Sequence, residues 1–219
     1  MKKYLHILKN TSLFQGICED EIEGMLQCLG ARTREFAKGK SIYHIGEKIT
    51  DVALVLEGAV HIKREDYWGN LSILNVISSG EVFGEAYAVP GSVAMVNDAV
   101  AACDSTILFL DIRRVLTSCP SSCRFHTVLI QNFFVVLAAK NRALAQKIGH
   151  MSQRTTREKL LSYLSEQSMK AGSPAFDIPF NRQQLADFLS VDRSAMSSEL
   201  GKMREEGMIE FSRGHFVLK

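Results

Sequence analysis

Apolar and polar positions follow a helical period at both ends of this chain and a shorter period between them. From residue 1 to 30, apolar side chains recur at intervals of three and four residues, which predicts short amphipathic helices. The middle of the chain holds short β-rich runs separated by turn residues, which predicts strands. The helical positions are Leu5, Leu8, Leu13, Phe14, Ile22, Met25, Leu26 and Leu29, and the β-rich runs are Ser41–His44, Val52–Leu56, Ala59–Lys63, Leu71–Ile77 and Ser105–Leu110.

Glycines separate the β-rich runs, at positions 39, 46, 58, 69, 80, 84 and 91. Glycine supplies a positive φ at tight turns without a clash from a Cβ atom. Many short strands with frequent turns are typical of a compact antiparallel roll or barrel. We therefore expect an α+β protein whose N-terminal part is an antiparallel β-roll.

A long helix is predicted after Pro120, over residues 121–149. Such a helix spans about 40 Å, which is more than a small domain needs for its own core. A second copy of the same helix is the simplest partner, and a helix packed wholly within its own subunit is the alternative. The expected partner-facing seam follows a three–four alternation through Phe125, Leu129, Asn132, Val136, Ala139, Ala143 and Gln146.

The C-terminal segment has the pattern of a helix-turn-helix. A helix over residues 152–169 is predicted to end at the turn Ala171–Pro174. Asn181 can then cap a short helix, and Asp192 or Ser190 can cap a second helix that Gly207 ends. The inward positions are Leu185, Phe188 and Leu189 on the first helix and Met196, Leu200 and Met203 on the second.

The outward positions of this segment have the chemistry of a DNA reader. Arginine pairs with guanine O6 and N7, and serine bonds to bases or phosphates. Residues 208–218 follow as a β-hairpin, which predicts a wing with an arginine near its tip. A helical hairpin used for protein contact is the alternative interpretation. The candidate DNA contacts are Arg193, Ser194, Ser197 and Ser198 on the second helix, Arg182 and Gln183 on the first, and Arg213 in the wing.

Composition sets few limits beyond these patterns. Hydrophobic residues make up 46% and charged residues 23%, as in globular proteins. The net charge of +2 does not itself indicate nucleic acid, so DNA binding rests on the local pattern. No run reaches the roughly eighteen apolar residues of a membrane span, and the first residues lack the apolar stretch of a secretion signal. We expect a cytoplasmic protein without a membrane partner.

Several short motifs occur in a characteristic order along the chain. The roll carries Lys38-Gly39, Gly46-Glu47, Leu56-Glu57-Gly58 and the run Ser79–Glu85, and the tail carries Asn181–Ala186, Arg193–Ser197 and Glu206–Ile209. With the long helix between them, these motifs resemble the cAMP receptor protein/FNR (Crp/Fnr) family of bacterial regulators over essentially the whole chain.

The resemblance implies an organisation and a set of partners. Residues 1–120 would form an effector-sensing domain with a cyclic-nucleotide-binding-like jelly roll, 121–149 a dimerisation helix, and 150–219 a winged helix-turn-helix. The partners would be a second copy of the chain and palindromic double-stranded DNA, and RNA polymerase is a further candidate. Effector binding would reposition the two DNA-reading heads of the homodimer.

One departure from the family concerns the effector. Cyclic-AMP-binding members follow the Gly-Glu turn, here Gly84 and Glu85, with an arginine-containing pair that grips the phosphate. That pair falls near Met95 and Val96, and no arginine lies between Glu85 and Asp111. Because a buried phosphate needs a cation or several donors, we expect an effector other than cAMP. Arg142 aligns with the family's adenine contacts and is a candidate contact for a different, anionic ligand; a solvated helix charge is the alternative.

Other cofactors of the family match this chain poorly. Of its five cysteines, only Cys18 and Cys28 lie near the N-terminus, too few and too widely spaced for the family's iron–sulfur cluster. Cys119 and Cys123 are expected to be structural, with a thiol redox switch as the alternative. Haem sensing has three candidate ligands, His61, His126 and His150.

Two functions of other classes compete with DNA binding. A metal-binding enzyme of the cupin type needs a close histidine pair with a carboxylate, whereas the roll offers only His44 and His61. No nucleophile, P-loop or dinucleotide motif occurs in the sequence. We therefore do not expect an enzyme, and a ligand-sensing module that does not bind DNA is the other alternative.

Overall fold

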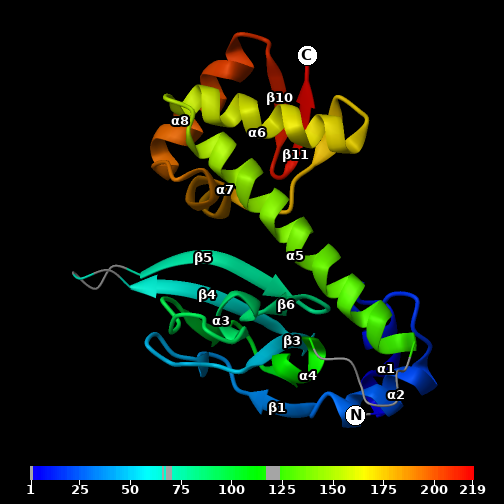
Figure 1. Ribbon diagram of the computed structural model, residues 1–219. Coiled ribbons are helices and arrows are strands. Elements are labelled where there is room, and N and C mark those ends of the chain that lie inside the picture. Colours follow the sequence, from blue (N-terminus) through cyan, green and yellow to red (C-terminus); the bar gives the residue numbers. More distant parts are fainter. Residues whose placement is uncertain (1, 66, 68–70, 117–123) are drawn as a thin grey trace. The chain divides into compact units, whose positions relative to one another are not determined.

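Two four-stranded antiparallel sheets form the N-terminal part of the protein in the computed structural model, which describes residues 2–65, 67, 71–116 and 124–219 (Figure 1). The first sheet has the order β1 (Arg32–Phe36), β8 (Ser105–Asp111), β3 (Asp51–Glu57) and β6 (Val82–Phe83). The second has the order β2 (Ser41–Tyr43), β7 (Asp98–Ala101), β4 (Ala59–Glu65) and β5 (Leu71–Ser78). Strands that are distant in sequence pair in both sheets, which confirms the predicted jelly-roll architecture.

Each of the five predicted β-rich runs coincides with a strand, except that β2 ends before His44, but the sequence pattern missed three other strands of the roll. In β1, the four residues before Phe36 are exposed, so the strand has no apolar alternation. In β6 only two residues pair, and β7 is buried along three of its four residues. These strands form because their neighbours supply hydrogen-bond partners, which local patterning does not reveal.

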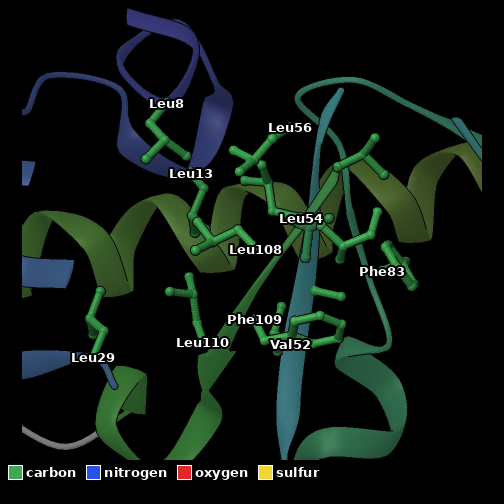
Figure 2. Packing of buried hydrophobic residues seen from close by; sticks show 14 of the residues in the cluster. Leu8, Leu13, Leu29, Val52, Leu54, Leu56, Phe83, Leu108, Phe109 and Leu110 are labelled. Atoms are coloured by element: carbon green, nitrogen blue, oxygen red, sulfur yellow. The ribbon is translucent and has the colours of Figure 1, made fainter. Parts of the chain in front are cut away.

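The first sheet is covered on both faces. The run Val52–Leu56 in β3 is buried without interruption, and successive strand residues point to opposite faces. On one face, Phe109 of β8 contacts Tyr43 of the second sheet, with ring centroids 5.9 Å apart. On the other, Leu8 and Leu13 lie on the side to which Leu108 points (Figure 2). The N-terminal helices η1 (Lys2–Tyr4), α1 (Leu5–Lys9), η2 (Ser12–Phe14) and α2 (Glu19–Cys28) therefore complete the core of the roll.

The long helix α5 (Arg124–Met151) follows the short α4 (Ile112–Leu116) and crosses the boundary between two compact units, residues 1–138 and 139–219. Leu129 and Phe133 are buried in the core of the roll. Asn132 Nδ2 donates to the carbonyl oxygens of Leu13 and Gln15 at 3.1 and 2.8 Å. The N-terminal half of the predicted seam is therefore wrong, because these positions face the chain's own roll. The expected helix start and the two cysteines 119 and 123 lie outside the described residues.

The C-terminal unit has its own core. It contains α6 (Thr156–Ala171), α7 (Arg182–Leu189), α8 (Arg193–Glu205) and a three-stranded sheet with the order β10 (Ile209–Ser212), β11 (His215–Leu218) and β9 (Ala175–Asp177). The predicted helix over 152–169 begins later, because Thr155 and Glu158 form a capping box that starts α6. The buried side chains include Leu160, Leu164, Leu185, Leu189, Met196, Leu200, Met203 and Phe216.

The turn between β3 and β4 depends on a glycine. Gly58 has φ 86°, and a Cβ atom there would lie 2.5 Å from Asp104 O and 2.8 Å from Ser105 Cα. We expect Gly58→Ala to lower the free energy of unfolding by about 3 kcal/mol, from left-handed strain together with the clash. Gly91 has φ 83° with open space around it, so Gly91→Ala should cost only about 1 kcal/mol. Urea unfolding of both variants measures the difference, and equal losses would contradict the packing described here.

Candidate nucleic-acid interface

The first helix of the helix-turn-helix is fixed at both ends. Asn181 Oδ1 accepts from Gln184 N and Gln184 Oε1 accepts from Asn181 N, both at 2.9 Å, so the pair forms a capping box. At the other end Ser190 has φ 51°, in the left-handed region that favours glycine. The Lys159 ammonium donates to the carbonyl oxygens of Leu189 and Ser190 at 3.3 and 3.4 Å, which satisfies the helix end.

The second helix, α8, exposes the predicted reading residues. Asp192 accepts a hydrogen bond from Ala195 N at 2.8 Å and so caps the helix. On the opposite side Met196, Leu200 and Met203 are buried against the rest of the unit. This burial leaves one face of the first turns in solvent. The exposed side chains there include the four predicted contacts Arg193, Ser194, Ser197 and Ser198.

An arginine that sequence reasoning missed joins α6 to α8. Arg157 Nε lies 2.5 Å from Glu199 Oε1, and its two terminal nitrogens donate to Glu206 at 2.8 and 2.7 Å. These hydrogen bonds raise the pKa of Arg157 above its ordinary value and hold the pKa of Glu206 below it. The guanidinium therefore fixes the position of α8 and neutralises acidic charge beside the reading helix. Neither partner is near in sequence, so no local spacing revealed the contact.

The two candidate residues at the start of α7 have intramolecular partners. The Arg182 guanidinium lies over the rings of Phe211 and Phe216, 4.7 and 5.2 Å from their centroids. Burial lowers the pKa of Arg182 from its ordinary value. Gln183 is exposed and donates to Asp187 at 2.8 Å. Arg182 thus packs the wing against α7, and a DNA contact by either residue stays a prediction.

The wing has an unusual backbone at its tip. Ser212 pairs with His215, so the connection between β10 and β11 consists of Arg213 and Gly214. Arg213 is exposed and has φ 52°, a left-handed conformation that a side chain with a Cβ atom adopts at a cost. A non-glycine residue kept in such a conformation is consistent with a functional side chain at that position. The geometry places an exposed cation at the end of the hairpin.

A buried polar cluster occupies the C-terminal unit where α5 ends. The ring nitrogens of His150 lie 2.8 Å from Ser162 Oγ and 2.7 Å from Glu166 Oε2, and its ring meets the Tyr163 ring edge-on. Burial alone would raise the pKa of Glu166, but hydrogen bonds from Lys170 and His150 hold it below its usual value. Both nitrogens of His150 are engaged, and His126 Nε2 lies 3.0 Å from Val115 O. His150 could bind iron only by losing one of its two bonds.

The candidate effector residues of the roll differ in their surroundings. Gly84 has φ 80° and precedes the short helix α3 (Glu85–Ala88), where Glu85 is the first residue. Met95 is buried and its backbone bonds to Gly46 N and Glu47 O, whereas the Val96 side chain is about half exposed (49%). No arginine lies between Glu85 and Asp111 in the sequence. The segment 86–110 therefore offers no lysine or arginine for a cyclic phosphate.

The cysteines at the N-terminus are far apart on one helix. Cys18 caps α2 and Cys28 ends it, and both are exposed. Ten residues of α-helix span about 15 Å, which is too far for two ligands of one cluster. In the part of the chain that the structure describes, no group of three or more histidine, cysteine, aspartate or glutamate side chains could hold a metal ion.

Helix α5 has an exposed apolar face other than the predicted one. Phe134, Leu144 and Ile148 are each more than 60% exposed. They belong to a series with the alternating four–three spacing of coiled-coil core positions: Ile130, Phe134, Leu137, Asn141, Leu144, Ile148 and Met151. By length and composition alone, α5 would be apolar enough to cross a membrane. Its other face is already used by the core of the roll, through Leu129 and Phe133. Arg142 is exposed on the same helix.

Comparison with known proteins matches both parts of the chain. The family described as "Cyclic nucleotide-binding domain" matches residues 33–119, and the family described as "Crp-like helix-turn-helix domain" matches residues 158–219. The cyclic AMP receptor protein of Thermus thermophilus is 24% identical over 94% of this chain and 92% of its own length. The transcriptional regulatory protein Btr of Bordetella pertussis is 23% identical over 90% of this chain and 81% of its own length.

Solved structures support the fold. A structure of CprK in complex with OCPA aligns with a TM-score of 0.71 at 16% identity, covering 90% of this chain and 88% of the other. The two matched families cover the jelly roll and the winged helix-turn-helix, and the long helix α5 lies between them. The chain therefore belongs to the Crp/Fnr family of transcriptional regulators, with a helix-turn-helix DNA-binding domain.

Proposed function

We propose that this regulator binds palindromic duplex DNA as a homodimer and responds to an effector other than cAMP. The observation that carries the DNA-binding proposal is the exposed face of α8, where Arg193 stands at the first helical position beside three serines. Recognition helices of this motif place their N-terminal residues against base edges in the major groove. The cytoplasm is the compartment in which such a protein meets DNA.

Each cation of the interface has a separate role in this proposal. Arg193 reads guanine through O6 and N7, and it sets the specificity of one base pair. Arg213 at the wing tip contacts a phosphate, which strengthens binding without reading sequence. Two copies of α8 in a dimer read two half-sites about 34 Å apart, one helical turn of DNA. RNA polymerase is a further candidate partner, recruited where activation is the output.

The second copy of the chain covers the exposed apolar face of α5 in this proposal. The four–three series from Ile130 to Met151 supplies the core positions of a two-stranded coiled coil. Asn141 is the polar member of the series and is exposed in the single chain. A lone asparagine at a core position favours a two-stranded assembly in a single register. The dimer therefore uses a face adjacent to that of Leu129 and Phe133.

The effector proposal rests on the chemistry of the roll. No arginine lies between Glu85 and Asp111, and Met95 presents a buried thioether chain near the expected phosphate position. The Asn97 Oδ1 atom is buried and accepts no hydrogen bond within the described part of the chain. A ligand with a donor group would satisfy it, whereas a phosphate would not. Arg142 remains a candidate contact for an anionic part of the ligand.

Effector binding would act by a population shift between two states of the dimer. The ligand alters the packing of the roll on the first half of α5, where Asn132 joins the helix to the N-terminal segment. The state in which both reading helices match their half-sites then becomes more populated. An enzymatic role has no support from a nucleophile, a metal-ligand group or a catalytic motif among the described residues.

The base-reading role of Arg193 is tested against the phosphate role of Arg213. Arg193→Ala should weaken binding to the selected operator by about 1–3 kcal/mol and relax the preference at one base pair. Arg213→Gly should weaken binding about equally on all sequences and lower the salt slope by about one. Fluorescence anisotropy at several salt concentrations, on the operator and on scrambled duplex, measures both. Retention of full specificity by Arg193→Ala would show that another residue reads that base.

The α5 interface is tested by a charge placed in the apolar series. Leu144→Glu should weaken the dimer about a hundredfold or more, because two like charges would be buried between the helices. Gln146→Glu is the matched control, since this position lies two residues away on the exposed outer side of such a coiled coil. Sedimentation equilibrium gives the mass in solution. An unchanged dimer in Leu144→Glu would place the interface elsewhere.

The effector proposal predicts that cAMP does not stabilise the protein. A ligand at a hundred times its dissociation constant raises the free energy of unfolding by about 2.7 kcal/mol, which shifts Tm by several degrees. We expect no such shift in a thermal melt with cAMP beyond that caused by the same concentration of inorganic phosphate. A cAMP-specific rise of several degrees would contradict the proposal.

A further inference from the structure

The hydroxyl hydrogen of Ser194 is already used inside the protein. Ser194 Oγ donates a hydrogen bond to Asp192 Oδ1 at 2.5 Å. Asp192 Oδ1 also accepts a hydrogen bond from Ala195 N. Asp192 is held in place because it is the N-cap of α8. The bonds from Ser194 and Ala195 hold the pKa of Asp192 below its ordinary value. A carboxylate without a proton cannot donate, so the hydroxyl is the donor of this pair.

This bond determines what Ser194 can offer to DNA. A serine hydroxyl has one hydrogen to donate and two lone pairs that accept. With the hydrogen engaged by Asp192, the exposed Ser194 oxygen presents only its lone pairs to a ligand. No comparable side-chain bond fixes Ser197 or Ser198 among the described contacts, so their hydroxyls are free to donate or to accept.

The major groove contains few groups that donate to an acceptor. Guanine offers N7 and O6 and thymine offers O4, all acceptors, whereas adenine N6 and cytosine N4 carry donor hydrogens. We propose that Ser194 reads the exocyclic amino group of an adenine or a cytosine in the operator. This inference rests on the proposed DNA-binding function and deepens it by naming the base chemistry at one position. Arg193 can only donate hydrogen bonds, so the base that it contacts must carry acceptors, as guanine does.

Asp192 acts as a positioning residue in this arrangement. It does not need to contact the base, because it orients the Ser194 hydroxyl from behind. Its replacement by alanine would free the hydroxyl hydrogen, and the serine could then also donate to guanine or thymine. Replacement by asparagine would keep an Oδ1 acceptor and the cap. Asp192→Ala is therefore expected to broaden the base preference at this position, whereas Asp192→Asn is expected to leave it unchanged.

The experiment begins with operator selection. The full-length chain, tagged and expressed in the organism that encodes it so that its effector is present, is captured with the DNA fragments it binds. The same is done for Ser194→Ala, Ser194→Thr, Asp192→Ala and Asp192→Asn. Ser212→Ala is the control, because it removes another exposed hydroxyl of the same unit that has no such carboxylate partner. Circular dichroism melts verify that each variant folds.

The expected result is a change at a single base pair. The wild type should prefer adenine or cytosine there, Ser194→Ala should lose the preference, and Ser194→Thr should restore it. Asp192→Ala should broaden the preference to guanine or thymine, and Asp192→Asn should keep it. Ser212→Ala should leave every base preference unchanged.

A base analogue then tests the hydrogen bond itself. In the selected operator, purine replaces the adenine, or 2-pyrimidinone replaces the cytosine, which removes only the amino group. The wild type should lose about three- to tenfold in affinity, as expected for one hydrogen bond, and Ser194→Ala should lose less than about twofold.

The outcomes separate this inference from the function on which it rests. If the wild type captures no specific DNA, the proposed DNA-binding function is wrong, and the inference fails with it. If specific DNA is captured but Ser194→Ala changes no base preference, or if the changed position holds guanine or thymine in the wild type, only the inference is overturned. Equal losses for wild type and Ser194→Ala on the analogue would also overturn it.

Discussion

Burial of one face of α8 decides which side chains this regulator can present to DNA. Met196, Leu200 and Met203 are nearly fully buried against α6, α7 and the sheet of the C-terminal unit. Because a helix repeats every 3.6 residues, fixing this inner stripe also fixes the outer one. Arg157 holds the same helix from the side through Glu199 and Glu206. The reading face is therefore a consequence of core packing, and its chemistry can change without a change in fold.

Helix α5 serves two apolar environments with two faces. Leu129 and Phe133 complete the core of the roll, and Asn132 ties the helix to backbone carbonyls of the N-terminal segment. The exposed members of the second series, Phe134, Leu144 and Ile148, are the ones that the proposed dimer would bury. A helix that is apolar all round would indicate a membrane or a deep core. In this chain one face of α5 packs in the core of the roll and the other is proposed to form the dimer. Asn141 is the polar residue within the second face.

The jelly roll combines a family architecture with an altered interior. Gly84 turns the chain with a positive φ into α3, whose first residue is Glu85. In the segment after this turn Met95 is buried, and the amide oxygen of Asn97 is buried without a hydrogen bond among the described residues. These residues are the basis of the proposal that the domain senses a ligand other than cAMP. One fold can bind different ligands, because ligand specificity depends on a few side chains of the binding site.

The sequence by itself determined the order of the elements, the antiparallel β-roll, the winged helix-turn-helix and the exposed set on α8, because these follow from local periodicity and capping. It did not reveal β1, whose residues before Phe36 are exposed and whose pairing comes from β8. It also placed Leu129 and Asn132 of α5 in the partner-facing seam, whereas both face the chain's own roll. Two overlapping apolar series run along that helix, and the sequence does not show which of them the roll buries. Only the structure revealed three further contacts: Arg157 with Glu199, Arg182 over the Phe211 ring, and the hydrogen bond from Ser194 to Asp192. Local patterns select helices, strands and turns, whereas the partner of a polar side chain depends on which segments the fold brings together.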